Sequence, residues 1–437
     1  MTAESMTISE SDANTLRKAT VRLVPFLGLI YFFAFFDRVN IAFAAIQMNA
    51  SLGLTPALYG LASGIFFLGY VAFQIPSSLI LRKIGTRQWI TAMVLSWGIL
   101  STLMGLTHSI GVFLTLRFLL GLAEAGVLPA VLLYFARWYP AAQRGKIVAM
   151  FLLSIPFAQV VGAPLAAHLL GLSGLGLAGW QWLFLASGIP NVVLGVITWF
   201  VLPEKPEDVR WLSREEKTWL GNALSLESKR IESAGLKGFS QVWRSPIVVL
   251  LGCIYFFGPG VGLFGMGFWM PLTLKGFGLA TTTVGWIVSF IYLLSALWMV
   301  VWSRHSDATK ERVWHVAACA LIGFVTLSLG GLLRSDLAVG LGLAFAMILV
   351  SPITPTFWSL PARYLTGRAA TVGFPAVAMI GNLGGFAGPY FVGLVKQQGG
   401  QTSLAMILLA LPVLICALLT LTLLSHPAIG SRSTVEG

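Results

Sequence analysis

Charged residues are scarce in this sequence. Asp, Glu, Lys and Arg make up 10% of its 437 residues, against about 25% in a usual soluble domain, and 57% of the residues are hydrophobic. This scarcity excludes an ordinary water-soluble globular domain. A helix needs about 20 apolar residues to cross a bilayer core. Such runs start near residues 22, 57, 88, 110, 146, 180, 246, 282, 313, 337, 370 and 402, so the sequence predicts an all-α membrane protein with twelve transmembrane helices.

Cysteine and histidine are also few. Cys253, Cys319 and Cys416 all fall inside predicted spans, which argues against disulfides and against a cysteine metal site. The five histidines show no spacing typical of metal ligands. We therefore expect no metal and no cofactor.

Two function classes lack the features that they need. The predicted spans contain no nucleophile paired with a base, so an enzyme is not expected. The longest loop has about 40 residues, which leaves no room for the soluble output domain that a receptor usually carries.

Positive charge is unevenly distributed along the chain. The net charge is +12, yet with the N-terminus inside, the outer connections carry only Lys275, Arg334 and Lys396. The positive-inside rule then places both termini in the cytoplasm of a multi-pass protein of the cell (inner) membrane. The basic balance is thus a topology signal, and no solvated basic domain remains to bind nucleic acid. The long first apolar run, with no small-residue cleavage pattern after it, predicts an uncleaved first helix.

A charged stretch at residues 203–245 divides the chain. We predict a cytoplasmic tail (1–19), a six-helix bundle (20–202), a cytoplasmic linker (203–245), a second six-helix bundle (246–425) and a second cytoplasmic tail (426–437). Within the linker, Ser213 and Glu216 have capping-box spacing, and Trp211, Trp219 and Leu220 indicate a short amphipathic helix on the inner membrane face.

The two predicted bundles share sequence landmarks at a constant offset of 225 or 226 residues. The matched pairs are Pro129 and Pro355, Arg137 and Arg363, Arg87 and Arg312, Trp89 and Trp314, and Pro164 and Pro389. A parallel repeat of two six-helix halves is the arrangement of major facilitator transporters.

Four charges lie deep in the predicted spans: Asp37, Arg38, Arg117 and Glu124. A charge at the centre of a spanning helix costs roughly 2.5 to 3.5 kcal/mol on insertion scales. The corresponding positions of the second half are all apolar, so the charges are confined to one half while the packing landmarks are duplicated. Arg117 and Glu124 are two turns apart and cannot pair directly, and Asp37 and Arg38 point about 100° apart. We therefore predict a network between the first and fourth spans, in which Asp37 and Glu124 contact the arginines.

The residue types indicate a chemistry for this network. Arg stays charged and presents a planar fork that matches a carboxylate, so we predict that Arg38 and Arg117 bind an anion. When the substrate takes the Arg partner of a buried carboxylate, that carboxylate binds a proton more readily. This would couple binding of the anion to binding of the proton. The structural alternative is a buried ion-pair cluster that only fixes helix packing, although such pairs are weak sources of stability.

Several motifs resemble one transporter family. Residues 37–40 (DRVN) and 117–145 (RFLLGLAEAGVLPAVLLYFARWYPAAQRG) look like the anion:cation symporter family of the major facilitator superfamily. Residues 357–367 (FWSLPARYLTG) and 381–390 (GNLGGFAGPY) are similar to its branch of tartrate and other organic-acid permeases. The resemblance implies a twelve-helix fold, alternating access and cotransport of an organic anion with a proton. It also implies that Asp37 and Glu124 carry the proton and that the two arginines hold the substrate.

The chain departs from the superfamily pattern after the second span. The usual Asp-Arg-x-Gly-Arg is replaced at residues 82–86 by RKIGT, so the Asp is missing, and Ala308 follows Asp307 where an Arg is usual. The way in which these loops hold the closed state is therefore not given by the resemblance.

Further polar and aromatic residues in the spans are candidates for substrate contact. Asn and Gln hydrogen-bond ligand hydroxyls but also bridge helices. The candidates are Tyr31, Gln159, Tyr255, Trp358 and Asn382. Small and kinking residues are instead expected to allow close packing and rocking, namely Gly162, Pro164, Gly384, Gly385, Gly388 and Pro389.

The substrate class stays open at this stage. Two arginines with Asn and Gln suit a small hydroxy acid such as tartrate or a sugar acid, and the similarity of residues 357–367 favours it. The aromatic residues equally suit an aromatic acid such as phthalate or hydroxyphenylacetate. Sodium coupling and uniport are alternatives to proton symport. The expected partners are a small organic anion, a proton and the lipid bilayer, and we expect a monomer.

Overall fold

The computed structural model describes residues 10–232, 245–365 and 367–425. Within these residues twelve helices, some of them broken into segments, are long and apolar enough to cross a membrane. The predicted number and positions of the spans are confirmed, and residues 233–244 of the predicted linker and the tails 1–9 and 426–437 lie outside the described residues. The first helix begins at Glu10, well before its predicted start near residue 22.

The first six spans use eight helices. They are α1 (Glu10–Ser51), α2 (Pro56–Ile84), α3 (Thr86–Leu106), α4 (Ile110–Glu124) with α5 (Val127–Ala136), α6 (Ala141–Leu152) with α7 (Ser154–Leu169), and α8 (Gly179–Val201). Local sequence explains their boundaries. Thr55 accepts a hydrogen bond from the backbone N–H of Leu58 and Pro56 opens α2, while Gly85, with a φ of 101°, separates α2 from α3.

The last six spans repeat the pattern with more breaks. They are α11 (Pro246–Tyr255), η2 (Phe256–Leu263) and α12 (Phe264–Gly276) as one span, α13 (Thr281–Thr309), α14 (Val313–Leu332), α15 (Asp336–Val350) with α16 (Ile353–Trp358) and α17 (Pro361–Tyr364), α18 (Gly367–Gln397), and α19 (Thr402–Thr422) with η3 (Leu423–Ser425). The segment η2 is a π-helix that contains Pro259, and π-segments within α-helices are frequent at functional sites.

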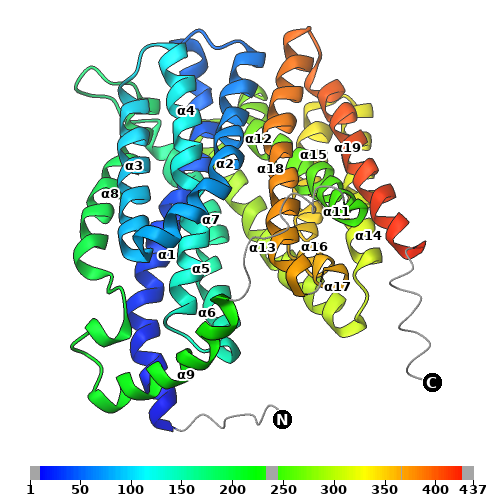
Figure 1. Ribbon diagram of the computed structural model, residues 1–437. Helices are drawn as coiled ribbons and strands as arrows, with labels where there is room; N and C mark the ends of the chain where they lie inside the picture. Colours follow the sequence, from blue (N-terminus) through cyan, green and yellow to red (C-terminus); the bar gives the residue numbers. More distant parts are fainter. Residues whose placement is uncertain (1–9, 233–244, 366, 426–437) are drawn as a thin grey trace.

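The two groups of six spans stand side by side in Figure 1, blue to green on the left and green to red on the right. The linker forms η1 (Pro206–Asp208) and then α9 (Arg214–Glu232), which lies across the end of the first group where α1 begins. We call this the terminal end of the molecule and the opposite one the far end.

The predicted capping box of the linker is confirmed. The backbone N–H of Ser213 donates to Glu216 at 2.8 Å, and the backbone N–H of Glu216 donates to Ser213 Oγ at 3.1 Å. Lys18 of α1 pairs with Glu216 at 2.8 Å, and Trp211 stacks on Trp138 with ring centroids 5.7 Å apart. The linker helix is therefore fixed to the terminal end of the first half.

Glycines allow α2 and α18 to approach closely at the far end. A Cβ on Gly60 would lie 2.5 Å from the carbonyl oxygen of Pro389, and one on Gly64 would lie 2.7 Å from that of Phe386. Gln397 Oε1 accepts hydrogen bonds from Thr55 Oγ1 at 2.9 Å and from the backbone N–H of Ala57 at 3.1 Å. These contacts close the far end between the two halves.

The predicted packing glycines are confirmed. An added Cβ would lie 2.4 Å from Phe256 O at Gly384, 2.6 Å from the Phe67 ring at Gly385, 2.5 Å from Val261 O at Gly388 and 2.8 Å from the Phe36 ring at Gly162. Real Cβ atoms do not come so close, so these positions need glycine for the helices to pack as they do.

Replacing Gly60 with valine is expected to open the far end. The atoms that the new side chain meets belong to the backbone of α18 and cannot swing aside, and such overpacking costs about 1 to 3 kcal/mol. We expect a Ser63→Cys reporter, at a position of α2 that is 0% exposed in the closed form, to react with an impermeant maleimide roughly 5- to 150-fold faster in the Gly60→Val background. The matched control is Gly111→Val, where the nearest atom is the Ser109 hydroxyl at 3.9 Å. Equal labelling rates in the two backgrounds would show that α2 and α18 do not form the seal.

The missing Asp after the second span has a substitute in Glu204, which follows the sixth span. Its Oε1 accepts from the backbone N–H and the hydroxyl of Thr86, both at 3.0 Å, and its Oε2 accepts from the backbone N–H of Arg87 at 2.8 Å. Arg137 at the end of α5 completes the cluster through an ion pair with Glu204. A carboxylate thus caps the N-terminus of α3, where the helix dipole favours negative charge.

This carboxylate should make stability depend on pH. Burial by itself raises the pKa of Glu204, but hydrogen bonds from the backbone N–H groups of Arg87 and Thr86, the Thr86 hydroxyl and the charge of Arg137 together lower it. A lowered pKa means that the stabilisation is complete above the ordinary Glu pKa of about 4.3 and is lost as the pH falls through the lower folded-state value.

We therefore expect Glu204→Gln to lower the melting temperature in detergent at neutral pH, with a loss of about 1.5 to 3 kcal/mol for a charged hydrogen-bonding group. The difference from the wild type should shrink as the pH falls below about 4. Glu207→Gln, in the same loop, is the matched control and should melt like the wild type. A melting difference for Glu204→Gln that stays constant down to acid pH would contradict this role.

Candidate functional site

The four deeply placed charges lie together in the middle of the first half. Asp37 and Arg38 are adjacent on α1, and the helix points them at different neighbours, as predicted. Arg38 reaches α4, where its Nε and Nη2 both donate to Glu124 Oε2 at 3.2 and 3.1 Å. The other carboxylate oxygen of Glu124, Oε1, is buried and has no hydrogen-bond partner among the described residues.

Asp37 faces α3 and, among the described residues, forms no ion pair with an arginine, which differs from our prediction. Its Oδ2 accepts from Trp97 Nε1 at 2.7 Å, and its Oδ1 accepts from Ser101 Oγ at 2.9 Å and from Asn40 Nδ2 at 3.4 Å. The cause is the direction of its side chain on α1, because Arg38 occupies the face toward α4. Asp37 is 1% exposed, so it is a buried carboxylate held by neutral donors.

Arg38 is the one member of this group that is open to its surroundings, with a side chain 18% exposed. Its guanidinium carbon lies 4.6 Å from the ring centroid of Phe35, 5.2 Å from that of Phe66 and 5.6 Å from that of Tyr70. These aromatic faces replace part of the hydration of the cation. Among the described residues the guanidinium is thereby fixed in place with Glu124 as its ion-pair partner.

Arg117 is held differently and is only 1% exposed. Its Nε donates to the backbone carbonyl of Ala62 on α2 at 3.1 Å, its guanidinium lies 5.3 Å from the Phe66 ring, and its Nη2 is buried without a partner in the described residues. The Phe66 ring is thus close to both arginines. In this form of the protein Arg38, not Arg117, is the accessible cation.

Aromatic residues of the second half form a wall near this site. The ring of Tyr255 lies 5.1 Å from that of Trp358 and 5.1 Å from that of Phe357, and Trp358 stacks on Phe374 at 6.0 Å. Tyr255 ends α11 directly before the π-segment, and Trp358 ends α16. Tyr255 is near enough to Arg38 and Tyr70 to interact with them electrostatically, which puts this member of the wall in the neighbourhood of the cation.

The remaining candidates are Tyr31, Gln159 and Asn382. Tyr31 is 7% exposed, with its ring 4.6 Å from that of Phe151 and 5.1 Å from that of Phe35. Gln159 on α7 and Asn382 on α18 are half-buried, and neither side chain makes a hydrogen bond within the described part of the chain. No group of three or more His, Cys, Asp or Glu side chains among the described residues could hold a metal ion.

Tyr70 and the partners of Asp37 were missed by sequence reasoning. Tyr70 is one of several aromatic residues in α2, and nothing in its spacing marks it as the one beside Arg38. Trp97 and Ser101 are one turn apart on α3, which would have indicated a shared face but not the carboxylate that they meet.

The chain matches known proteins along almost its full length. Residues 27–389 match the family model described as Major Facilitator Superfamily. A protein of Agrobacterium vitis named "Putative tartrate transporter" is 40% identical over 419 residues, which are 95% of this chain and 96% of that protein. The quinolone resistance transporter of Acinetobacter baumannii is 36% identical over 94% of each chain.

Solved structures share the fold at low sequence identity. A bacterial homolog of the human lysosomal transporter Spinster, in an inward-facing and unoccupied conformation, superposes with a TM-score of 0.72 at 17% identity, covering 97% of this chain and 98% of that one. The D-xylose-proton symporter superposes with a TM-score of 0.68 at 16% identity, covering 92% and 96%. The chain is a multi-pass membrane transporter and not an enzyme, and it belongs to the major facilitator superfamily.

Proposed function

We propose that the protein is a proton-coupled symporter of a small organic anion, a hydroxy acid such as tartrate or a sugar acid. The observation that carries this proposal is the exchangeable pair between Arg38 and Glu124. The arginine is partly exposed and donates twice to one carboxylate oxygen of Glu124, while the other oxygen has no hydrogen-bond partner in the described part of the chain. The relative named for tartrate supports the choice of anion.

The pair provides a coupling mechanism. A substrate carboxylate that engages the planar fork of Arg38 takes the place of Glu124. Glu124 is then a buried carboxylate without its cation, and burial favours its neutral, protonated form. Binding of the anion therefore recruits a proton, and both leave together when Glu124 returns to Arg38.

We assign supporting roles to the other charges. Asp37, held by Trp97 and Ser101, is the second proton carrier, and Arg117, whose guanidinium lies 5.3 Å from the Phe66 ring, is the second cation that holds the anion. Tyr31, Gln159 and Asn382, together with Tyr70, bind the body of the substrate from the first and second halves. Tyr255 and Trp358 form its aromatic boundary.

Transport proceeds by alternating access between two rigid bundles, residues 20–202 and 246–425, joined by the cytoplasmic linker 203–245. With both termini in the cytoplasm of a cell whose inner membrane holds the protein, the far end faces outward. The contacts of α2 with α18 close that end, so this form is the one that exchanges substrate with the cytoplasm.

An aromatic carboxylate is the second candidate substrate. The observation that favours it is the wall of Tyr255, Trp358 and Phe374, because stacked rings accept a planar ring between or against them. Phthalate and hydroxyphenylacetate are the test compounds for this class.

The proposal is tested by uptake of labelled acids into liposomes containing the purified protein. Tartrate, a sugar acid and phthalate are each supplied under an inward proton gradient, an inward sodium gradient, or neither. We expect tartrate or the sugar acid to accumulate with the proton gradient alone. Accumulation of phthalate instead would select the second candidate. Accumulation with sodium, or uptake that never exceeds the outside concentration, would contradict proton symport.

A further inference from the structure

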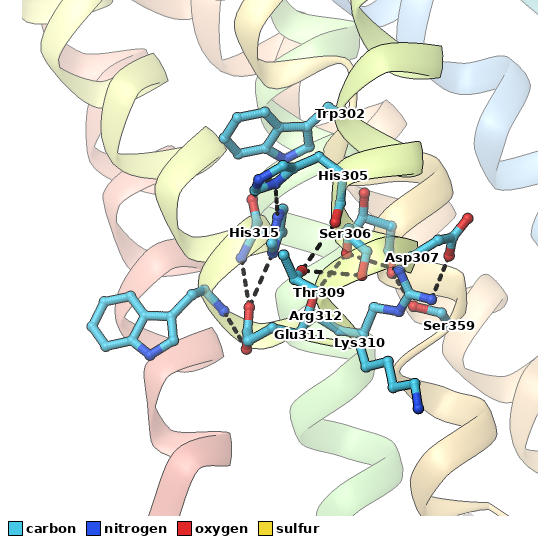
Figure 2. A network of polar contacts seen from close by, with 12 residues as sticks. Trp302, His305, Ser306, Asp307, Thr309, Lys310, Glu311, Arg312, His315 and Ser359 are labelled. Atoms are coloured by element: carbon cyan, nitrogen blue, oxygen red, sulfur yellow. Dashed lines mark hydrogen bonds and ion pairs between the residues drawn. The ribbon is translucent and has the colours of Figure 1, made fainter.

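A polar network at the terminal end of the second half holds two histidines in direct contact (Figure 2). His305 near the end of α13 and His315 near the start of α14 face each other, with His305 Nδ1 2.8 Å from His315 Nε2. On its other side His315 Nδ1 lies 3.1 Å from Glu311 Oε2. His305 is exposed, whereas His315 is 8% exposed.

The protons in this chain of contacts can be assigned. A carboxylate only accepts hydrogen bonds, so His315 Nδ1 donates to Glu311. The Nε2 of a neutral His315 is then bare and accepts the proton of His305 Nδ1. One added proton can bind at the exposed Nε2 of His305 and leave every hydrogen bond in place. A second proton would need the Nε2 of His315, where the facing N–H of His305 leaves no room for it.

Glu311 remains an ionised hydrogen-bond acceptor while the histidines bind these protons. Burial by itself raises its pKa, but the backbone N–H groups of Trp314 and His315 and the side chain of His315 together lower it. The N–H of Trp314 donates to Glu311 Oε1 at 3.0 Å, so the same carboxylate caps the start of α14. The first added proton therefore makes His305 cationic, so that its hydrogen bond to His315 becomes charge-assisted, while Glu311 still accepts from His315 as a carboxylate.

The network continues from the histidines to α17. Ser306 Oγ donates to the backbone carbonyl of Glu311 at 2.7 Å, and Arg312 pairs with Asp307 and donates to Ser306 Oγ. Arg363 of α17 donates to the carbonyl of Lys310, which has a left-handed φ of 55°. Through α17 the connection between α13 and α14 reaches α16, which carries Trp358 of the aromatic wall.

Few other charged or titratable side chains lie near the two histidines and could respond to protons in their place. The charged residues at this end of the packed elements are Arg304 and Asp307 on α13, Lys310, Glu311 and Arg312 in the connection, and Arg363 on α17. Helices α16 and α19 carry no charged residue over their lengths, and the thiols of Cys319 and Cys416 are buried among apolar side chains.

We propose that His305, His315 and Glu311 form a proton-responsive latch that regulates the carrier from its cytoplasmic side. One proton tightens the connection of residues 310–312 and so fixes α17, and a second proton breaks the contact between the histidines and releases it. The regulatory part rests on the proposed function, whereas the response of the latch to protons does not.

Hydrogen exchange tests the latch without any transport. Exchange of peptides covering residues 309–316 is followed by mass spectrometry at about pH 8, 6.3 and 4.8, and the rates are corrected for intrinsic exchange. We expect the wild type to exchange about fivefold more slowly near pH 6.3 than at pH 8, as charge-assisted bonds form, and faster again at the acid end.

A test variant and a control variant show whether the two histidines cause the pH dependence of exchange. The double variant His305→Asn with His315→Gln places amide groups near the facing nitrogens, so it keeps a hydrogen bond but cannot titrate and should show a flat corrected profile. His168→Asn, on α7, is the matched control and should keep the bell-shaped profile of the wild type, in which protection from exchange is greatest near pH 6.3. A flat wild-type profile, or a bell that survives in the double variant, would overturn the latch. A bell-shaped profile in a protein that moves no organic acid would support the latch and refute the proposed function.

Discussion

Arg38→Lys is expected to reduce the kcat/KM for uptake by on the order of 100-fold, because truncating one partner of a buried charged pair costs about 2 to 5 kcal/mol. Lysine keeps the charge but loses the planar fork that holds Glu124 Oε2 through two donors. It also loses the flat face that lies against Phe35, Phe66 and Tyr70. Initial uptake rates of labelled acid in liposomes measure the effect.

The control for this prediction is Arg334→Lys, since Arg334 lies in an exposed connection far from the site. It should transport like the wild type. If Arg38→Lys retained most of its uptake while its melting temperature stayed normal, the arginine would be a structural cation and the anion would bind elsewhere.

Glu124→Gln should separate substrate exchange from proton-driven accumulation. Glutamine has the shape of a protonated glutamate and still offers an oxygen to Arg38, but it cannot take up or release a proton. For each proton that moves with an anion, a gradient of one pH unit supports about tenfold accumulation, since 1.4 kcal/mol is a factor of ten. We expect this ratio to fall to about one in the variant while exchange of labelled for unlabelled acid continues.

Asp37→Asn provides the comparison for Glu124→Gln. Asp37 does not touch Arg38, so its replacement should slow proton-driven uptake without changing the affinity for the anion in exchange. Full accumulation in both variants would exclude the two carboxylates as proton carriers. Loss of exchange as well as accumulation in Glu124→Gln would show that Glu124 is needed for binding, not for coupling alone.

The division of labour between the halves explains why the repeat is asymmetric. The first half supplies all four deep charges, and the second half supplies the wall of Tyr255, Trp358 and Phe374. A substrate whose carboxylate binds Arg38 and whose remaining part packs against the wall would contact both bundles. Substrate binding can then bias their relative position, since a ligand shifts an equilibrium only through differential contacts with the two states.

Much of the fold could be predicted from sequence because a spanning helix is a local property. Twelve apolar runs, the glycines of α18 and the capping box at Ser213 each depend on residues close together in the chain. The four charges could be recognised for the same reason, since a charge inside an apolar run is visible without its partners.

The partners themselves could not be predicted, because they depend on which face of each helix meets which neighbour. Asp37 was expected beside an arginine and instead meets Trp97 and Ser101 on α3. Glu204 caps α3 from a position far along the chain, and Gly260 in the π-segment lies so close to α18 that an added Cβ would be 2.5 Å from the carbonyl oxygen of Gly381. These features arise from tertiary contacts that no periodicity in the sequence records.

Simultaneous measurement of proton and acid movement tests the central claim most directly. Purified protein in liposomes is given tartrate, a sugar acid or phthalate from outside, with no imposed gradient, while a pH-sensitive dye follows the outer solution and labelled acid is counted inside. The account predicts that the transported acid makes the outer solution more alkaline in proportion to its uptake, and that Glu124→Gln exchanges acid without this signal. Entry of labelled acid into wild-type vesicles with no change of outer pH would contradict proton symport through the Arg38 and Glu124 pair.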